Sequence, residues 1–378
     1  MIHGMSDHEP GWAQDSYLGS IEKEAGWTVT LPLANPVDVR WEEPVEAKPG
    51  EKIPFPVAGF AGTLLRYQIV DRSGQTALIA YELTWSNLTR PFKLVRFGHP
   101  ITNIENQTPP PGAKDDVAQR RPGANEELRN AIDLYLSDVA LYARGFDGHV
   151  INKTVDHALQ MFYEGALEPD QSPEARKRLR TEPTVFLSES LGSIMLMEAF
   201  AKQEREWRPG KPNADAEKYS RLKDASQNLR VVYMMANQMA LLNMPEEDRN
   251  GNAVPVLSAS RVAASSNEES EQAPPPVWGA FYNARKNLGT SDNERLTIAA
   301  FSDLYDVLSW PANQMSIPAA SDGAPVFNVD NFYPVNSVAL IAPIGIEEDP
   351  DSAHTTYGTN SKVYKLLVHG YVPQDVRN

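Results

Sequence analysis

Three serines stand within six residues in the stretch TVFLSESLGS (184–193): Ser188, Ser190 and Ser193. A nucleophilic serine on a sharp turn between a strand and a helix needs small residues two positions before and two positions after it, because these residues lie close together. Ser190 meets this requirement, with Ser188 before it and Gly192 after it, whereas each of the other serines has a bulky residue at one or both places. The pattern therefore predicts a nucleophile elbow at Ser190 and acyl-transfer chemistry.

A serine of this kind works with an acid and then a histidine later in the chain, each beyond a strand. The run LTIAAFSDLYD (296–306) supplies Asp303 and Asp306 after an apolar stretch, and Asp306 is the preferred acid because Asp303 can cap the following turn. His354 follows in a segment of small and polar residues, predicted to be a loop. In the predicted triad, His354 takes the proton of Ser190, and Asp306 orients and stabilises the imidazole.

Acyl transfer also needs N–H donors for the oxygen that becomes negative. The first predicted donor is the backbone N–H of Leu191, at the start of the helix that follows the elbow. The second is predicted in the opening residues MIHGM, where the N–H of Met5 or Gly4 follows a His-Gly pair and Gly4 permits the turn.

Composition excludes several other classes of protein. The chain has 378 residues, 41% hydrophobic and 22% charged, with a formal net charge of −15. This charge opposes binding to nucleic acid or anionic lipid. The absence of cysteine excludes disulfides, thiolate metal sites and a cysteine nucleophile. No run approaches the ~20 apolar residues that span a bilayer, and no signal peptide is recognised, so a cytoplasmic location is expected; a preceding N-terminal segment would make secretion the alternative.

Short apolar runs of buried-strand type alternate with helical patterns, which predicts an α/β domain with a mostly parallel sheet covered by helices on both faces. No boundary between two domains is evident, and the irregular stretches 87–123 and 243–279 are expected to be insertions or lid-like loops. The predicted elements are a hairpin at 63–86, helices at 125–145, 149–166 and 191–207, strands at 184–189, 229–237 and 296–303, and a further strand within 326–343.

These residues resemble a bacterial family of serine esterases and lipases with the α/β-hydrolase fold. The similar segments are IHGMSDHEPGW, YELTWSNLTRPFK, LYLSDVALY, VFLSESLGS, MMANQMALL, AFSDLYDVLSW and SAHTTYGTN. The resemblance implies one α/β-hydrolase domain over residues 1–378, which hydrolyses small-molecule or lipid esters without a cofactor. The sequence departs from the family pattern in two places. Ser188 stands where the elbow usually has Gly, and only Met1 and Ile2 precede His3. The family's His-Gly loop follows a full strand, so the resemblance implies N-terminal strands that this sequence lacks.

Three alternatives stay open beside the esterase hypothesis. The first is a catalytically silent binding protein of the same fold. The second is an amidase or acyltransferase that uses the same triad. The third alternative is a metal-dependent hydrolase with His3, Asp7 and His8 as ligands. No metal site is expected, because no pair of histidines has helical spacing and no second ligand cluster is present. The sequence does not specify an oligomeric state.

Overall fold

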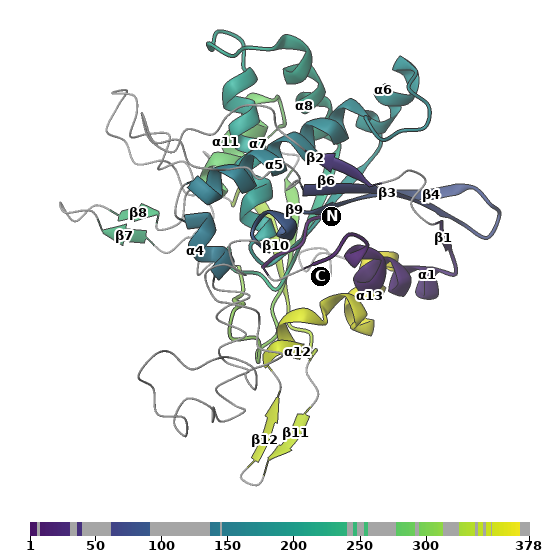
Figure 1. Ribbon diagram of the computed structural model, residues 1–378, viewed down its shortest axis with the longest axis vertical. Coiled ribbons are helices and arrows are strands. Elements are labelled where there is room, and N and C mark those ends of the chain that lie inside the picture. The colour runs from purple at the N-terminus through teal and green to yellow at the C-terminus, as the bar shows by residue number, and fades with distance from the viewer. Residues whose placement is uncertain are drawn as a thin grey trace, which may run out of the picture.

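The computed structural model shows a mixed α/β protein, in which helices gather around a central sheet (Figure 1). It describes residues 1–5, 8–30, 36–39, 62–90, 137–143, 146–239, 245–247, 253–255, 277–291, 295–312, 325–336, 339–342, 345–348 and 350–370. Most of the predicted insertions at 87–123 and 243–279, and the first half of the predicted helix at 125–145, lie outside these residues.

Four parallel strands form one half of the sheet, in the spatial order β10-β9-β6-β5. The prediction of a mostly parallel sheet is confirmed for these four strands but not for the other half of the sheet, which is antiparallel, and the strand at 184–189 has the predicted bounds. β5, β6 and β9 are mostly apolar and are buried in their carboxyl-terminal halves, as expected of strands covered on both faces, whereas β10 is more polar and mostly half-buried. Their bounds are Thr184–Glu189 for β5, Leu229–Met235 for β6, Leu296–Phe301 for β9 and Phe327–Phe332 for β10.

The other half is antiparallel and is built on the predicted hairpin, β3 (Gly62–Val70) and β4 (Thr76–Thr84). The short strands β1 (Thr28–Thr30) and β2 (Val37–Val39) pair with the far edge of β3. Ile2 joins the two halves, because it forms parallel bridges to Leu83 of β4 and to Ser188 of β5.

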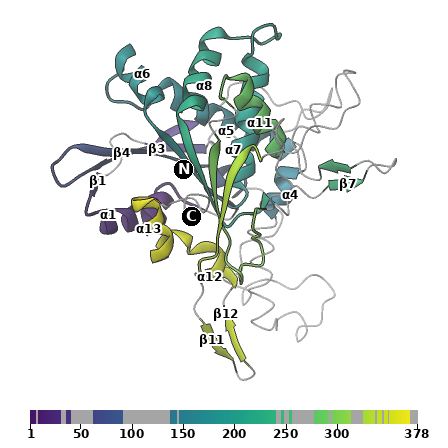
Figure 2. The same ribbon diagram turned by 180° about the vertical axis from the view of Figure 1, so that it is seen from behind.

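One face of the sheet is covered by four helices, which form a single layer in both views (Figures 1 and 2). The side chains of Phe186, Val232 and Ile298 point into this layer and belong to the larger hydrophobic core. The helices are α5 (Phe146–Glu164), α7 (Gly192–Trp207), α8 (Ala216–Asn228) and α11 (Val277–Asn287), with α4 (Ser137–Ala143) and α6 (Pro173–Thr181) at the margins.

The opposite face is covered by segments from the two ends of the chain, which lie side by side in both views. These are η1 (Gln14–Leu18), α1 (Gly19–Ala25) and α13 (Ser361–His369). Leu187 and Tyr233 point to this side and belong to a second core. Since successive residues of a strand face opposite sides, adjacent residues of β5 and β6 enter different cores, and the prediction of helices on both faces is confirmed.

Several short elements follow β4, β6 and β10. The predicted loop around His354 is in fact a helix, α12 (Pro350–Thr355), which begins at a proline, a residue suited to the first helical position. The remaining elements are η2 (Ser86–Leu88), β7 (Pro245–Glu247), β8 (Ala253–Pro255), β11 (Ala339–Ala342), β12 (Gly345–Glu348) and η6 (Tyr357–Thr359). Within the described residues, no helix combines the length and the apolar character needed to cross a bilayer.

Candidate active site

Ser190 occupies a sharp turn between β5, which ends at Glu189, and α7, which begins at Gly192. Its φ is 51°, in the left-handed region that residues with a Cβ rarely adopt. Its backbone N–H donates to the carbonyl oxygen of Met235 at 2.8 Å, which ties the turn to the end of β6. Backbone strain of this kind persists only where the surrounding structure holds it, and it is concentrated at functional sites.

The His3–Gly4 segment packs directly against this turn. A Cβ on Gly4 would lie 2.4 Å from the Cβ of Ser190 and 2.7 Å from the carbonyl oxygen of Glu189. Reciprocally, a Cβ on Gly192 would lie 2.6 Å from the carbonyl oxygen of His3. Glycine is therefore required on both sides of the contact, and the two segments interlock through their backbones.

The hydroxyl groups of the three serines have different environments. Ser188 Oγ lies 2.9 Å from Ser193 Oγ and donates to the carbonyl oxygen of Tyr233 at 3.1 Å. Ser190 Oγ is buried and has no hydrogen-bond partner in the described part of the chain. The elbow thus presents one hydroxyl that the protein's own hydrogen bonds do not use.

His3 supports the loop through both ring nitrogens. Its Nε2 accepts the backbone N–H of Trp85 at 2.9 Å, so Nδ1 carries the proton and donates to the carbonyl oxygen of Gly4 at 2.8 Å. The ring stacks on Trp85 with a centroid distance of 4.9 Å. This neutral, buried histidine is occupied structurally, which argues against the metal-ligand alternative. Asp7 lies outside the described residues.

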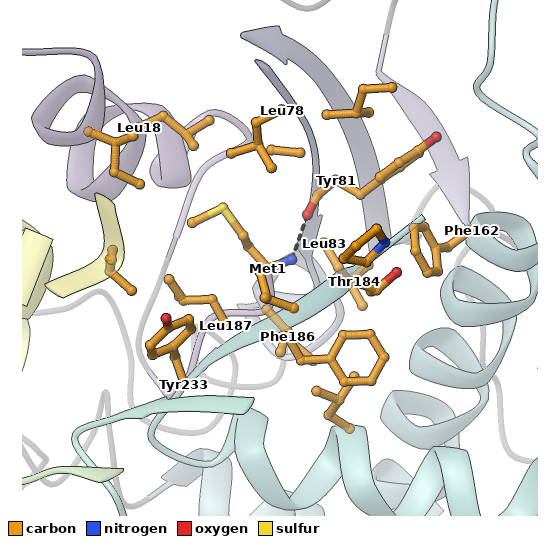
Figure 3. A pocket seen from close by; sticks show the side chains of 18 of the residues that line it. Met1, Leu18, Leu78, Tyr81, Leu83, Phe162, Thr184, Phe186, Leu187 and Tyr233 are labelled. Atoms are coloured by element: carbon orange, nitrogen blue, oxygen red, sulfur yellow. Dashed lines mark hydrogen bonds between the residues drawn. The ribbon is translucent and has the colours of Figure 1, made fainter. Parts of the chain in front are cut away.

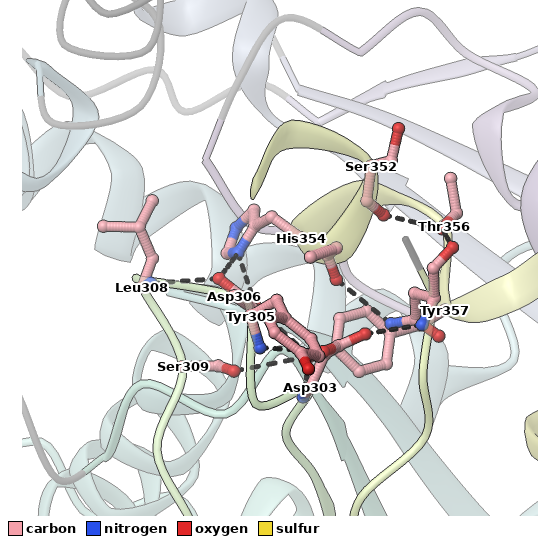
Figure 4. A network of polar contacts seen from close by, with 11 residues as sticks. Asp303, Tyr305, Asp306, Leu308, Ser309, Ser352, His354, Thr356 and Tyr357 are labelled. Atoms are coloured by element: carbon pink, nitrogen blue, oxygen red, sulfur yellow. Dashed lines mark hydrogen bonds and ion pairs between the residues drawn. The ribbon is translucent and has the colours of Figure 1, made fainter. Parts of the chain in front are cut away.

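His354 and Asp306 form a buried pair (Figure 4). His354 Nδ1 lies 2.9 Å from each carboxylate oxygen of Asp306. Asp306 also accepts the backbone N–H of Leu308 at 2.9 Å and the hydroxyl of Tyr357 at 3.2 Å. A carboxylate bound to Nδ1 leaves Nε2 as the basic nitrogen of the imidazole.

The carboxylate of Asp303 makes none of these contacts. Its carboxylate accepts the backbone N–H groups of Tyr305 and Asn336 and so shapes the loop after β9. The expectation that Asp303 caps the turn agrees with these hydrogen bonds, and the structure places Asp306 rather than Asp303 against His354.

Two further residues position the acid loop, and sequence reasoning missed both. The Tyr357 hydroxyl accepts the N–H of Asp303 at 2.7 Å while it donates to Asp306. Asn237, just beyond β6, exchanges hydrogen bonds with the backbone of Trp310 at 2.7 and 2.8 Å. The segments MMANQM and HTTYG contain these residues, but nothing in their local spacing indicates a contact with residues 303–310.

Glu189, the last residue of β5, has a buried carboxyl group that interacts electrostatically with the pair. Burial raises its pKa to about 7, the charge of His354 opposes this shift, and the charge of Asp306 adds to it. These interactions place the carboxyl within electrostatic range of both residues. Ser190 and Asp306 follow the parallel strands β5 and β9, whose carboxyl ends meet at one edge of the sheet, and His354 of α12 is bonded to Asp306 there. The structure thus brings the three predicted residues to the same edge, although Ser190 Oγ and His354 are not hydrogen-bonded.

The predicted oxyanion donors surround the same turn. Leu191 follows Ser190 directly, and Gly4 and Met5 belong to the segment that packs against it. Within the described residues, no hydrogen bond uses the N–H groups of these three residues. Unused N–H groups beside a serine hydroxyl can bind an anionic oxygen.

In the described residues, no group of three or more His, Cys, Asp or Glu side chains is placed to bind a metal ion. Comparison with known proteins adds no relative. No protein-family model matches the chain, and no curated protein or solved structure matches it.

Proposed function

We propose that this chain is a serine hydrolase of the α/β-hydrolase type, which cleaves carboxylic esters through an acyl-enzyme on Ser190. The observation that carries the proposal is the strained turn at Ser190, whose free hydroxyl lies at the same sheet edge as the buried Asp306–His354 pair. An ordinary strand-to-helix connection has no need of a left-handed serine, interlocked glycines and a buried carboxylate–imidazole pair together.

In the proposed reaction, His354 Nε2 accepts the proton of Ser190 Oγ as the oxygen attacks the ester carbonyl. Asp306 stabilises the imidazolium through Nδ1. The imidazolium then gives its proton to the departing alcohol. In the second half of the reaction, His354 takes a proton from the water that attacks the acyl-enzyme, and it returns this proton to Ser190 Oγ as the acid product leaves. The N–H of Leu191, with that of Met5 or Gly4, stabilises the negative oxygen of each tetrahedral intermediate.

The same machinery would serve an amidase or an acyltransferase. The ester assignment rests on the resemblance of the sequence segments around Ser190, Asp306 and His354 to esterases and lipases. A panel of ester and amide substrates with the same acyl group separates these classes, since an amidase would retain activity on the amides.

Ser190→Ala provides the decisive test. We expect it to abolish labelling by a fluorophosphonate probe and to lower hydrolysis of p-nitrophenyl esters by at least about 10³-fold. Ser193→Ala is the matched control, because Ser193 is an equally buried serine on the first turn of α7, and it should keep most of the activity. Activity retained in Ser190→Ala would refute the proposal.

One observation favours a second candidate, a catalytically silent binding protein of this fold. Ser190 Oγ lacks a hydrogen bond to His354, although such bonds often tighten only in the complex with substrate. A folded wild-type protein that neither reacts with the probe nor hydrolyses esters of any chain length would favour the binding protein.

A further inference from the structure

A cavity of about 570 Å³ is lined by β4 and β5, with mostly apolar side chains around it (Figure 3). Neither Ser190 nor Asp306 nor His354 is among the described residues that line it, so it is separate from the candidate active site. Ligands of open α/β sheets bind outside the carboxyl ends of the parallel strands. In this protein those are the ends of β5, β6 and β9.

The turn after β6 has the same unusual backbone conformation as the turn after β5. Ala236 has a φ of 49°, and in the described part of the chain Ser190 and Ala236 are the only residues other than glycine with a positive φ. The pairing of Glu189 with Met235 makes these two residues neighbours across the sheet. Strain of this kind costs stability and is concentrated at functional sites, which indicates that the turn after β6 belongs to the same site as Ser190.

Hydrogen bonds hold this turn between the two parts of the predicted triad. On one side, the carbonyl oxygen of Met235 accepts the N–H of Ser190 at 2.8 Å. On the other side, the N–H of Asn237 donates to the carbonyl oxygen of Phe301, at the end of β9, at 3.1 Å. The turn therefore lies between the reactive serine and the loop that carries Asp306.

Asn237 and Gln238 are adjacent buried residues whose amides differ in their hydrogen bonds. The nitrogen of the Asn237 amide donates to the carbonyl oxygen of Trp310 at 2.7 Å, and its oxygen accepts the N–H of Met239 at 3.2 Å. The second bond closes a turn around Gln238 and fixes its backbone. Gln238 is 1% exposed, yet neither the nitrogen nor the oxygen of its amide has a hydrogen-bond partner in the described part of the chain.

A buried amide without partners lowers stability, because it gives up its hydrogen bonds to water and gains none in return. An unbranched apolar side chain such as methionine would fill similar space at no such cost. The hydroxyl of Ser302, just after β9, is also buried and without a partner among the described residues. Ser190, Gln238 and Ser302 thus supply unused polar groups after three neighbouring strands. A few such groups orient the ligand in a mostly apolar binding site.

We propose that the amide of Gln238 hydrogen-bonds a polar group of the ester substrate, so that the site takes esters with a hydroxyl or a carboxamide close to the scissile carbonyl. This inference rests on the proposed function of Ser190. An amide both donates and accepts hydrogen bonds, and a hydroxyl or a carboxamide complements it in both respects. A plain alkyl ester would leave the amide unpaired. The polar group belongs either to the acyl part or to the alcohol part of the ester, and the test separates the two.

The test measures kcat/KM by acid release for three esters. Propyl pentanoate is the plain reference, propyl N-acetylglycinate carries an amide in its acyl part, and 2-hydroxyethyl pentanoate carries a hydroxyl in its alcohol part. Gln238→Met should lower kcat/KM for at least one polar ester by about 10–100-fold, while kcat/KM for propyl pentanoate stays close to that of the wild type. The ester that is affected identifies the part that Gln238 binds, because comparison with the wild type on each ester cancels differences in intrinsic reactivity.

Gln238→Met should also raise the melting temperature by about 2 °C, because it removes a buried polar group that has no partner in the free protein. Gln203→Met is the matched control. Gln203 is an equally buried glutamine on α7, and its amide donates to the carbonyl oxygen of Asp156 at 2.7 Å. Its replacement should therefore lower the melting temperature and leave the preference between polar and plain esters unchanged.

Equal losses of kcat/KM on all three esters would overturn the role of Gln238 in recognition, and so would unchanged values on both polar esters. A lower melting temperature of Gln238→Met would also overturn it, because the amide would then stabilise the free protein. These results in an active enzyme refute only the role of Gln238. Hydrolysis retained in Ser190→Ala, or a wild type inactive on every ester, would instead refute the proposed function of Ser190 and this inference with it.

Discussion

Asp303 and Asp306 lie three residues apart in one loop but make different contacts. Asp306 binds the imidazole of His354, whereas Asp303 accepts two backbone N–H groups of its own neighbourhood. Both carboxylates are buried, so burial alone does not distinguish them. Their hydrogen-bond partners do distinguish them. These partners predict a catalytic role for Asp306 and a structural role in the loop for Asp303.

Asp306→Asn is expected to lower kcat/KM for a p-nitrophenyl ester by about 10²–10⁴-fold, because a neutral amide neither stabilises the imidazolium nor selects its tautomer. Asp303→Asn is the matched control. It should lower the melting temperature through the weakened loop while its effect on kcat/KM stays well below that of Asp306→Asn. Equal losses of kcat/KM in folded variants would contradict the assignment of the acid.

At the scale of elements, the site depends on the contact between the turn after β5 and the His3–Gly4 segment. The pairing of Ile2 with β5 fixes this contact, because Ile2 is hydrogen-bonded on both sides of Ser188. Its N–H donates to the carbonyl oxygen of Leu187 at 3.0 Å, and its carbonyl oxygen accepts the N–H of Glu189 at 3.1 Å. The segment therefore reaches Ser190 as a continuation of a strand. A side chain at either glycine would separate the two elements.

Gly192→Ala should lower the free energy of unfolding by about 3 kcal/mol, because its Cβ would meet the backbone carbonyl of His3. It should also reduce ester hydrolysis by displacing the oxyanion donors. Gly74→Ala is the control, since its Cβ meets nothing within 4 Å but its φ is +79°. We expect it to cost about 1 kcal/mol through that conformation, without loss of activity. If chemical denaturation gave similar losses of unfolding free energy for Gly192→Ala and Gly74→Ala, the close backbone contact between Gly192 and His3 would be contradicted.

At the scale of the whole molecule, hydrophobic cores pack on both faces of the sheet, and polar groups are buried between them at its carboxyl edge. Glu189 is the clearest case, because burial raises its pKa from 4.5 to about 7 and the negative charge of Asp306 adds to this shift. A raised pKa means that the folded state binds this proton more tightly than the unfolded state. Ionisation of Glu189 therefore opposes folding.

The stability of the wild type should consequently fall as pH rises from about 4.5 to about 7, by about 3 kcal/mol from this group. Glu189→Gln lacks this ionisation, so the difference in unfolding free energy between the variant and the wild type should grow in its favour between pH 4.5 and pH 8. Urea denaturation at several pH values measures it. Glu217→Gln, at an exposed position on α8, should show no comparable trend, and a flat difference for Glu189→Gln would contradict the raised pKa.

Local patterns predicted much of the fold. The strand at 184–189, the hairpin on 63–86 and the helix after Ser190 follow from runs of apolar residues and turn residues, which report burial and chain direction. The patterns did not predict α8 and α11. They also misjudged the segment around His354, because its small and polar residues have no helical periodicity and the helix is only six residues long.

The sequence by itself determined which serine stands on a turn with small neighbours, and it placed an acid and a histidine after later strands, because these features are local. Only the tertiary structure decided that Asp306 rather than Asp303 meets His354, that Tyr357 joins the acid, and that His3 is occupied by the backbone of Trp85. Each of these depends on which strands are neighbours in the sheet, and pairing between distant segments leaves no periodic signal in the sequence.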